Sequence, residues 1–376
     1  MLKKLFTYIN KRQWTLLSIL VICFIASIVF VYHNATFYDR PIAKVMETKL
    51  EKTSKQTDSY HNEDTLYTES ITAEIKNGVD KGKHIQLKNT YSTSGAYDQA
   101  YKPGNELFVS IDKHAKGAES LTGSIKDVKR DKYIVIVAWI FIFVLLLVGK
   151  RQGLFAAVSL GVNTVVLAYA IDLNVRTNMN LLLICGITAI LFTMLSLLLV
   201  NGFNEKTYAA IIATLLGTIA SLLITYVVMR LTFENGLHYE EMQFLTRPYK
   251  LVFIAGLFIG SLGAVMDVAI TMSSSIFELY HQDANMSEAA LKKSGMDIGK
   301  DIMGTMTSIL FFAYISGSIP MLILYLKNAS PLGFTLSMNL SLELARALSG
   351  GIGIVLTIPI GLYTSIYLIR RKRAKV

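Results

Sequence analysis

Hydrophobic residues along the chain form eight runs, each close to the length needed to cross a membrane. A bilayer core requires about 20 apolar residues per helix. The pattern therefore predicts eight transmembrane helices, at Trp14–Val31, Tyr133–Val148, Leu154–Ala170, Leu181–Val200, Ala209–Met229, Leu251–Ser273, Ile302–Leu326 and Ala347–Ile369. The second and third runs are short. We interpret the basic linker between them, Gly149–Gly153, as a turn, because its charges would be costly inside the bilayer.

A polar segment of residues 33–132 separates the first apolar run from the second. Polar and apolar residues alternate in three short stretches of it, and Lys102–Asn105 has the composition of a turn. The alternating stretches are Ile71–Ile75, Ile85–Leu87 and Leu107–Ile111. Such strands between turns favour a small β-barrel or sandwich, although Lys44–Asp64 shows little periodicity.

Three parts of the chain follow from this pattern. We expect a cytoplasmic N-terminus and membrane anchor at residues 1–32, a β-rich domain at 33–132, and a seven-helix membrane domain at 133–376. The first run could instead be a cleaved signal peptide. We prefer an uncleaved anchor because the run is long and the residues after Val31 lack a small-residue cleavage site.

Composition and charge support an all-α polytopic membrane protein with a small β-rich extracytoplasmic domain. The chain is 52% hydrophobic and 17% charged, whereas soluble domains carry about 25% charged residues. The net charge of +10 comes from basic residues at the ends of the apolar runs, so it does not indicate nucleic-acid binding. Lys3 and Lys4 precede the first run, and Arg370–Arg373 follows the last. This bias predicts that both termini are cytoplasmic.

Candidate chemistry outside the membrane helices is sparse. Cys23 and Cys185 lie inside apolar runs, where neither zinc binding nor a disulfide is favoured. The histidines of the polar segment lack the spacing of a zinc site. The chain has no Walker A, His-Glu-x-x-His or Gly-x-Ser-x-Gly motif, and no Gly-x-Gly-Asp element of an intramembrane aspartyl protease. We therefore expect no metal site, no cofactor and no enzymatic activity.

The sixth apolar run carries small and polar residues three or four positions apart, which places them on one face of a helix. These residues are Gly256, Gly260, Gly263, Asp267, Thr271 and Ser274. Glycines at such spacing commonly serve tight helix packing, and we predict that role for the three in this run and for Gly353 in the last run. Asp267 is different, because packing does not require a carboxylate and an ionisable residue inside a membrane is costly. We predict that Asp267 binds a proton, a cation or a substrate.

The seventh run has a shorter face of the same kind. Asp301, Thr305 and Ser308 are its polar members and Gly304 is a packing candidate, with Tyr314, Ser316 and Ser318 further along. Asp301 has two interpretations, a functional carboxylate or a cap at the start of a helix. The cap interpretation assumes a separate short helix before it, capped by Ser287 and ended by Gly295.

The motifs Gly263-Ala-Val-Met-Asp267 and Asp301-Ile-Met-Gly-Thr-Met-Thr307 resemble those of the YibE/F family of bacterial multi-pass membrane proteins. The resemblance covers Tyr133 to the C-terminus, and the anchor with its polar domain is similar to the longer, YibE-like members. This chain has Lys300 where the family has arginine, and Ser308-Ile309 where it has asparagine and threonine. The resemblance implies a permease-like protein of the bacterial cell membrane, with a paralogous membrane protein or a second copy as partner.

The sequence is compatible with two functions. The first is transport of an unidentified solute, coupled to protons or cations, with Asp267, Asp301, Thr271, Ser274, Thr305 and Ser308 along the pathway. The second is a membrane complex subunit or scaffold that does not transport, whose extracytoplasmic domain senses or docks a partner. In both cases we expect the helices to contact the lipid bilayer.

Overall fold

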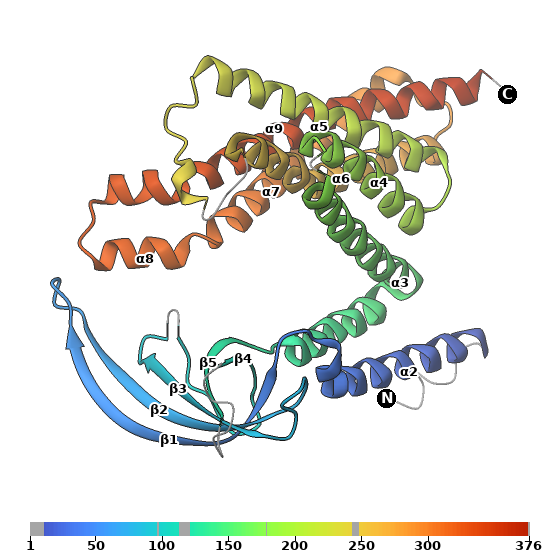
Figure 1. Cartoon of the computed structure of the whole chain (residues 1–376). Helices are drawn as coiled ribbons and strands as arrows, with labels where there is room; N and C mark the ends of the chain where they lie inside the picture. The colour runs from blue at the N-terminus through green and yellow to red at the C-terminus, as the bar shows by residue number, and fades with distance from the viewer. Residues whose placement is uncertain (1–10, 96–97, 113–120, 178, 243–247, 375–376) are drawn as a thin grey trace, which may run out of the picture. The chain divides into compact units, whose positions relative to one another are not determined.

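The computed structural model describes residues 11–95, 98–112, 121–177, 179–242 and 248–374, with side chains from Ser18 onward (Figure 1). Lys3 and Lys4 lie outside these residues. The chain forms two compact units, residues 1–144 and 145–376, which are described separately.

The first unit begins with α2 (Lys11–His33), which covers the predicted anchor. A short 3-10 helix, η1 (Asn34–Phe37), links it to the β domain. Helix α2 packs against the first residues of α3 (Asp131–Thr177) through aromatic rings. The rings of Phe24 and Trp139 lie 5.5 Å apart, and Trp139 Nε1 donates a hydrogen bond of 2.7 Å to Ser27 Oγ.

The β domain is a closed five-stranded barrel, which confirms the predicted β-rich domain. Its strands are β1 (Ile42–Thr57), β2 (Glu63–Ile75), β3 (His84–Ser92), β4 (Glu106–Ile111) and β5 (Leu121–Val128). They follow the order β1-β2-β3-β5-β4, and only β3 and β5 pair in parallel. The interior is filled by side chains that alternate along the strands, among them Val45, Ile71, Ile85, Leu107 and Val109.

The polar pattern did not predict two of the strands, β5 and the longer β1. Strand β1 pairs with β2 from Ala43 to Thr57, and most of its residues beyond Val45 are exposed, so no alternation marks it in the sequence. Two register shifts further interrupt the pattern. The three predicted stretches all lie in strands, and the turn is confirmed by a hydrogen bond from Asn105 N to Lys102 O and a positive φ of 93° at Gly104.

The second unit is a helix bundle with long apolar elements. Helices α4 (Leu181–Asn201), α5 (Glu205–Leu231) and α6 (Tyr249–Gln282) cover three predicted spans. Helix α9 (Leu332–Arg373) covers the last one but begins fifteen residues before it. The 3-10 helix η3 (Tyr239–Glu241) lies between α5 and α6.

Helix α3 covers the second and third predicted spans and is interrupted at one residue. Lys150 adopts φ 49° and ψ −119°, which is not helical. This break lies inside the segment predicted as a turn. The interruption is therefore confined to one residue of the basic linker.

The seventh predicted span is wrong as a single helix. Residues 302–326 are divided between α7 (Glu288–Ser316) and α8 (Ile319–Lys327), which meet at an angle of 51°. The described residues contain six helices long and apolar enough to cross a membrane, or seven if the bent pair counts as one span. The count of eight is therefore not reproduced.

The short helix predicted before the seventh span begins where expected, after Ser287, but it does not end at Gly295. Ser287 caps α7, because its Oγ accepts a hydrogen bond of 3.2 Å from Ala290 N. The helix then continues through Gly295. A Cβ there would overlap Ile276 and Leu362, so glycine allows α6 and α9 to approach closely instead of ending the helix.

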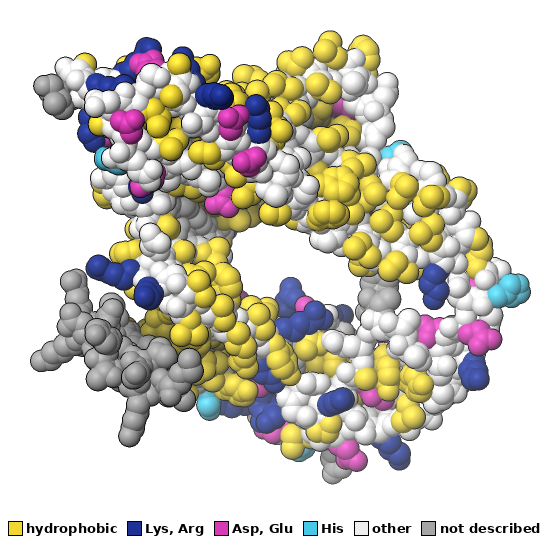
Figure 2. Space-filling view, turned by 180° about the vertical axis from the view of Figure 1, so that it is seen from behind, with side chains coloured by type: hydrophobic (Ala, Val, Ile, Leu, Met, Phe, Trp, Pro, Cys, Tyr) yellow, Lys and Arg dark blue, Asp and Glu magenta, His cyan; other side chains and the backbone are white. Residues whose placement is uncertain are grey.

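Large apolar side chains cover the outside of these helices as well as the core. They include Leu216, Leu223, Val227, Phe312 and Tyr367. Figure 2 shows hydrophobic side chains over the bundle, and it groups Lys, Arg, Asp and Glu near the end that carries the C-terminus. Apolar helices with apolar outer surfaces are typical of a multi-pass membrane protein.

Candidate functional site

Helix α7 contacts α6 at two points, and between them the polar face of α6 predicted from the sequence is left uncovered. At one end, the Tyr314 hydroxyl lies where a Cβ of Gly260 would stand. Toward the other end, Ile276 of α6 packs on Gly295 of α7. These two contacts show that the helices run antiparallel. Between them, a Cβ at Gly263 would meet no atom of the described residues within 4 Å.

Asp267 lies in this open part of the face. Its side chain is exposed, and no described residue forms an ion pair or a hydrogen bond with its carboxylate. Counting seven residues from the Gly260–Tyr314 contact places Asp267 level with Thr307 of α7, and counting from Gly295 places it level with Gly304. An unpaired carboxylate within an apolar helix is costly in a membrane. The residue therefore needs water, a ligand or a neighbour outside the described residues.

Asp301 is not a helix cap. It lies in the interior of α7, well after the Ser287 cap, so its carboxylate cannot satisfy free N–H groups at a helix start. The cap interpretation was wrong because it assumed that the helix ended at Gly295. By the same two counts, Asp301 lies level with the segment from Ile270 to Ser273, which contains Thr271. It is thus displaced from Asp267 by about one helical turn, or ~6 Å at 1.5 Å per residue.

The hydroxyl groups of the two faces bond to their own helices. Thr271 Oγ1 donates to the Asp267 carbonyl at 2.8 Å, Thr305 Oγ1 to Ile302 O at 2.9 Å, and Ser308 Oγ to Gly304 O at 2.8 Å. Such bonds satisfy a hydroxyl without a partner helix. The hydroxyl oxygens keep free lone pairs that can accept hydrogen bonds or bind a cation.

The predicted packing glycines divide into two groups. Gly260 meets Tyr314, and a Cβ at Gly353 would lie 2.9 Å from Val265 Cγ2. At Gly256, Gly263 and Gly304, a Cβ would meet nothing within 4 Å among the described residues. Packing at those three positions stays a prediction, and it requires a neighbour beyond the described part of this chain.

One end of the α6 face opens into a cavity of about 380 Å³, which we name the α5 pocket. Ser274 and Glu278 of α6 line it together with Lys206, His281 and Lys372. Lys372 Nζ forms an ion pair of 3.0 Å with Glu205. Of the predicted site residues, Ser274 is the one that lines this cavity.

The other end of the bundle contains a cavity of about 400 Å³, which we name the α8 pocket. It lies at the break between α7 and α8 and is lined by Ser318, Asn339, Glu343 and Arg346. Arg346 forms an ion pair with Glu343, and its guanidinium lies 5.4 Å from the ring centroid of Phe253.

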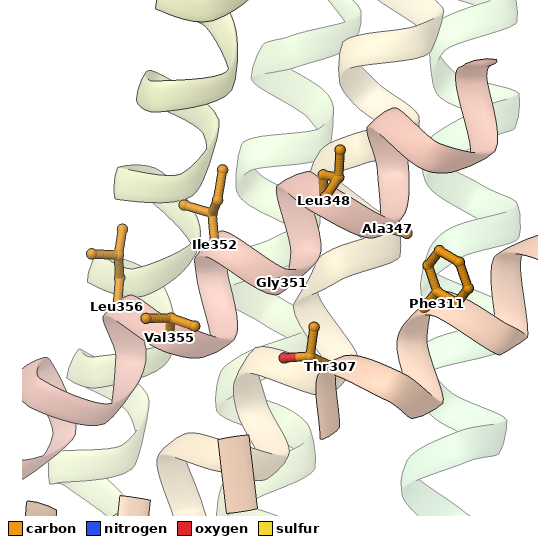
Figure 3. Close-up of a pocket in the computed structure, with 8 residues that line it drawn as sticks. All are labelled: Thr307, Phe311, Ala347, Leu348, Gly351, Ile352, Val355 and Leu356. Atoms are coloured by element: carbon orange, nitrogen blue, oxygen red, sulfur yellow. The ribbon is translucent and has the colours of Figure 1, made fainter. Parts of the chain in front are cut away.

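A third cavity, of about 350 Å³, has a different character. It lies between α7 and α9, and Figure 3 shows it surrounded by Phe311, Leu348, Ile352 and Val355. Thr307 provides a hydroxyl, which already donates to Met303 O at 2.8 Å. An apolar cavity of this kind suits hydrocarbon and does not offer groups for a polar solute.

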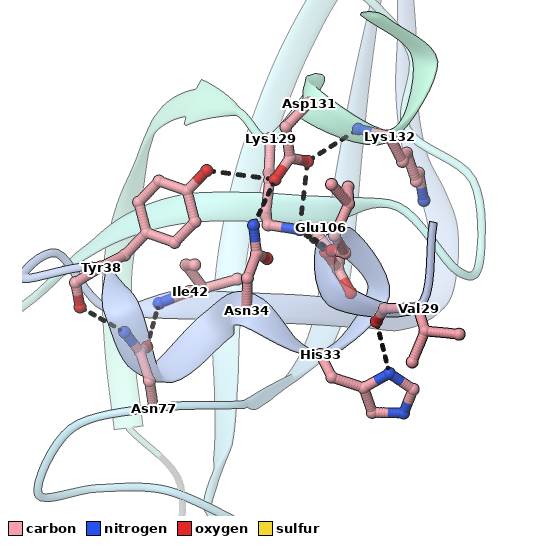
Figure 4. A network of polar contacts seen from close by, with 11 residues as sticks. Val29, His33, Asn34, Tyr38, Ile42, Asn77, Glu106, Lys129, Asp131 and Lys132 are labelled. Atoms are coloured by element: carbon pink, nitrogen blue, oxygen red, sulfur yellow. Dashed lines mark hydrogen bonds and ion pairs between the residues drawn. The ribbon is translucent and has the colours of Figure 1, made fainter. Parts of the chain in front are cut away.

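A separate polar cluster joins the barrel to the two helices of the first unit (Figure 4). Lys129 is 2% exposed, and its ammonium pairs with Glu106 at 2.8 Å and Asp131 at 3.1 Å. It also donates to Val31 O at the end of α2 at 3.0 Å. One buried cation therefore ties β4, α2 and the start of α3 together.

Asn34 and Tyr38 complete this cluster. Asn34 Nδ2 donates to Asp131 Oδ2 at 2.9 Å, and the Tyr38 hydroxyl donates to the same oxygen at 3.1 Å. The cluster was not predicted, because the residues lie far apart in the sequence. The only signal was a lysine between two acidic neighbours, Asp127 and Asp131, just before an apolar run.

Comparison with known families matches both units. Residues 137–371 match the model of the YibE/F-like protein, and residues 36–128 match that of the YibE/F family N-terminal domain. The chain belongs to the YibE/F-like family. Comparison with curated proteins and with solved structures finds no match.

The two motifs that indicated the YibE/F-like family both fall in the larger matched region. The structure brings Asp267 and the segment Gly304–Thr307 to the same level on adjacent antiparallel helices. The α8 pocket was not predicted as a site. Its Asn339, Glu343 and Arg346 precede the predicted last span, and the sequence gives no sign that a helix break brings Ser318 beside them.

Proposed function

We propose that this YibE/F-like chain is a permease that moves a small solute, coupled to protons or cations, along the polar face of α6. The observation that supports the proposal is the position of Asp267. Its unpaired carboxylate lies on an open face that leads at one end into the α5 pocket. At the other end the face meets the Tyr314 hydroxyl of α7.

The break between α7 and α8 also favours transport. Discontinuous helices expose backbone groups and helix ends, and secondary transporters commonly bind their substrates beside such breaks. In this chain the break at Gly317 and Ser318 lines the α8 pocket. Asp267 would bind the coupling ion, and the hydroxyls of Thr271, Thr305 and Ser308 would offer further oxygen ligands.

The proposal includes a topology for the chain. We count each half of α3, on either side of Lys150, as one crossing of the bacterial cell membrane, and the bent pair α7–α8 as another. Eight crossings place both termini in the cytoplasm and the barrel outside, in agreement with the basic residues Arg370–Arg373. No enzymatic step is part of this function.

Proteoliposomes test the proposal directly. The purified full chain is reconstituted with the pH indicator pyranine inside, and a proton gradient or ²²Na⁺ is applied outside. We expect a proton or sodium flux above that of empty liposomes for the wild-type chain. Asp267→Asn keeps the size of the side chain but removes its charge, so we expect the flux to fall to that of empty liposomes.

Asp297→Asn provides the matched control. Asp297 lies on α7, but its carboxylate is exposed and pairs with Lys300 at 3.4 Å. This variant should keep the full flux. Equal flux through wild-type chain, Asp267→Asn and empty liposomes would contradict the proposal.

The second candidate function is a membrane complex subunit that docks a partner through the barrel. The buried Lys129 cluster favours it, because the cluster fixes the barrel to α2 and to the start of α3. The open glycines Gly256, Gly263 and Gly304 are compatible with a second copy or a paralogous protein in the membrane. Cross-linking in native membranes would support this function if Lys129→Met abolished association while the flux of the variant stayed normal.

A further inference from the structure

A cavity of about 410 Å³ lies between the end of α5 and the start of α6, and we name it the Arg230 cavity. Arg230 belongs to the last turn of α5, and Lys250 is the second residue of α6. Glu234, from the segment between the two helices, is the one carboxylate among the described residues of the lining. The two cations therefore outnumber the carboxylate by one, which favours an anionic ligand.

The guanidinium of Arg230 is accessible and only partly engaged. Its Nε donates a hydrogen bond of 3.0 Å to the Tyr226 hydroxyl, and the group lies 5.5 Å from the centroid of that ring. Its two terminal nitrogens donate to no described residue, and the side chain is exposed. The Glu234 carboxylate pairs instead with Lys250, at 2.9 Å. A guanidinium with both terminal nitrogens free can bind two oxygens of one phosphate group.

The start of α6 adds to this positive charge. Pro248 precedes the helix without a side-chain cap, and the residues from Pro248 to Leu251 all line the cavity. The N–H groups at a helix start carry a partial positive charge that stabilises a nearby anion. An anion in the cavity would therefore have the helix start beside it as well as the two side-chain cations.

The other walls favour an anion that is attached to hydrocarbon. Met229, Leu251 and Ile254 line the cavity together with the rings of Tyr226 and Tyr249. Helices α5 and α6 are both apolar enough to cross a membrane, so the cavity at their ends lies at the level where a bilayer meets water. Tyrosines are enriched at that level, and basic pockets between membrane helices bind lipid headgroups.

We propose that the Arg230 cavity binds the phosphate group of an anionic phospholipid. The phosphate accepts hydrogen bonds from the terminal nitrogens of Arg230 and is attracted by Lys250, while an acyl chain lies against Leu251 and Ile254. A soluble phosphate has the same charged group, but the apolar walls favour the lipid. Asp267 does not line this cavity, so lipid binding goes beyond the proposed transport and holds whether or not the chain moves a solute.

Calorimetric titration of the purified full chain in detergent tests the proposal. The probes are dioctanoyl phosphatidylglycerol, which is anionic, dioctanoyl phosphatidylcholine, whose choline cancels the charge, and inorganic phosphate. We expect saturable binding of phosphatidylglycerol, and binding of phosphatidylcholine weaker by about tenfold or more. Inorganic phosphate that binds as tightly as phosphatidylglycerol would support the phosphate site and replace the lipid with a soluble compound. Equal binding of the two lipids, or no binding of phosphatidylglycerol and phosphate, would overturn the proposal.

Two variants with opposite effects locate the binding. Arg230→Gln removes the guanidinium and should weaken phosphatidylglycerol binding by about tenfold or more, as expected when hydrogen bonds to a charged group are lost. Glu234→Gln removes the carboxylate that competes with the lipid for Lys250, so this variant should bind phosphatidylglycerol more tightly than the wild-type chain. Misfolding does not increase affinity, and the gain in Glu234→Gln therefore separates a direct role from a structural one.

Arg176→Gln is the matched control for charge at a helix end. Arg176 belongs to the last turn of the apolar helix α3, but it pairs with Asp172 at 2.8 Å and does not line the Arg230 cavity. This variant should bind phosphatidylglycerol with wild-type affinity. An equal loss of affinity in Arg176→Gln and Arg230→Gln would indicate general attraction of lipid to basic helix ends and overturn the proposal. Unchanged affinity in Arg230→Gln, or no gain in Glu234→Gln, would also overturn it.

Discussion

The hydroxyl group of Tyr314 on α7 stands where a side chain at Gly260 on α6 would begin, so a glycine at this position is what lets the two helices meet. The contact closes one end of the open polar face. One glycine therefore sets the spacing of α6 and α7 at this end of the segment that contains Asp267.

Gly260→Val should destabilise the bundle by about 1–3 kcal/mol, because the added methyl groups would overlap Tyr314. Gly263→Val is the matched control on the same helix and face, where a Cβ meets nothing within 4 Å among the described residues. Thermal unfolding of the two variants in detergent should give a lower midpoint for Gly260→Val. Truncation of the ring in the double variant Gly260→Val, Tyr314→Ala should restore part of the loss. Equal midpoints for the two single variants would show that the contact is not tight.

Much of the membrane domain could be predicted because lipid-facing helices must be apolar along their whole length. The predicted spans at Leu181–Val200 and Ala209–Met229 differ from α4 and α5 by a few residues at their ends. The predicted start of α7 is wrong, because Asp297, Lys300 and Asp301 interrupt the apolar run but not the helix. Hydropathy reports where a helix meets lipid, and it does not report where its hydrogen bonds begin and end.

The candidate site was predictable only where it lies on one helix. Periodicity alone assembled the α6 face, because residues three and four apart share a face. The α8 pocket depends on a bend between α7 and α8 and on Asn339 from another helix. The meeting of residues from α7, α8 and α9 at this pocket is a property of tertiary packing, and no spacing in the sequence encodes it.

Ser287→Ala should loosen the start of α7, whereas Asp301→Asn should not. Ser287 Oγ accepts from Ala290 N, and loss of an N-cap costs about 1 kcal/mol. Asp301 lies inside the helix, where no free N–H groups need its carboxylate. Hydrogen exchange of the full chain should show faster exchange for residues 288–291 in Ser287→Ala alone. Equal fraying in Asp301→Asn would restore the cap interpretation of that residue.

Lys129→Met should destabilise the first unit by about 3–5 kcal/mol, the usual cost of removing one partner of a buried ion pair. The substitution leaves Glu106 and Asp131 without their shared cation. Both tryptophans of the chain, Trp14 and Trp139, belong to this unit, so tryptophan fluorescence follows its unfolding. Lys126→Met is the control, because Lys126 is exposed, and it should leave the midpoint unchanged.

The contribution of Lys129 should depend on pH in a defined direction. Burial by itself lowers the pKa of the Lys129 ammonium, but hydrogen bonds and attraction from Glu106 and Asp131 outweigh it and raise the pKa. A raised pKa in the folded state gives stability that is complete below the unfolded-state pKa of about 10.4 and is lost above it. The difference in midpoint between wild type and Lys129→Met should stay constant up to about pH 10 and shrink at higher pH. A difference that shrinks between pH 6 and 8 would contradict this assignment.

Cysteine accessibility separates a water-filled pathway from a packing surface at the open part of α6 and α7. The starting variant lacks Cys23 and Cys185, and single cysteines then replace Gly263, Gly304 or Leu223. Leu223 is an exposed apolar residue of α5 and serves as the lipid-facing control. If ions reach Asp267, the charged reagent methanethiosulfonate ethylsulfonate should modify Gly263→Cys and Gly304→Cys in intact membranes but not Leu223→Cys. The membrane-permeant N-ethylmaleimide controls for reactivity.

If the charged reagent modifies neither Gly263→Cys nor Gly304→Cys, the result indicates a packing surface, because a second copy or a paralogue that covers these positions would exclude the reagent. Both positions would then stay unmodified until detergent separates the subunits, and labelling would rise on dissociation. Such a result would contradict a hydrated pathway on this face. It would also account for Asp267 through burial in an interface, where a neighbouring subunit satisfies its carboxylate. The three open glycines would then have the packing role that their spacing predicts, with the partner supplied by another chain.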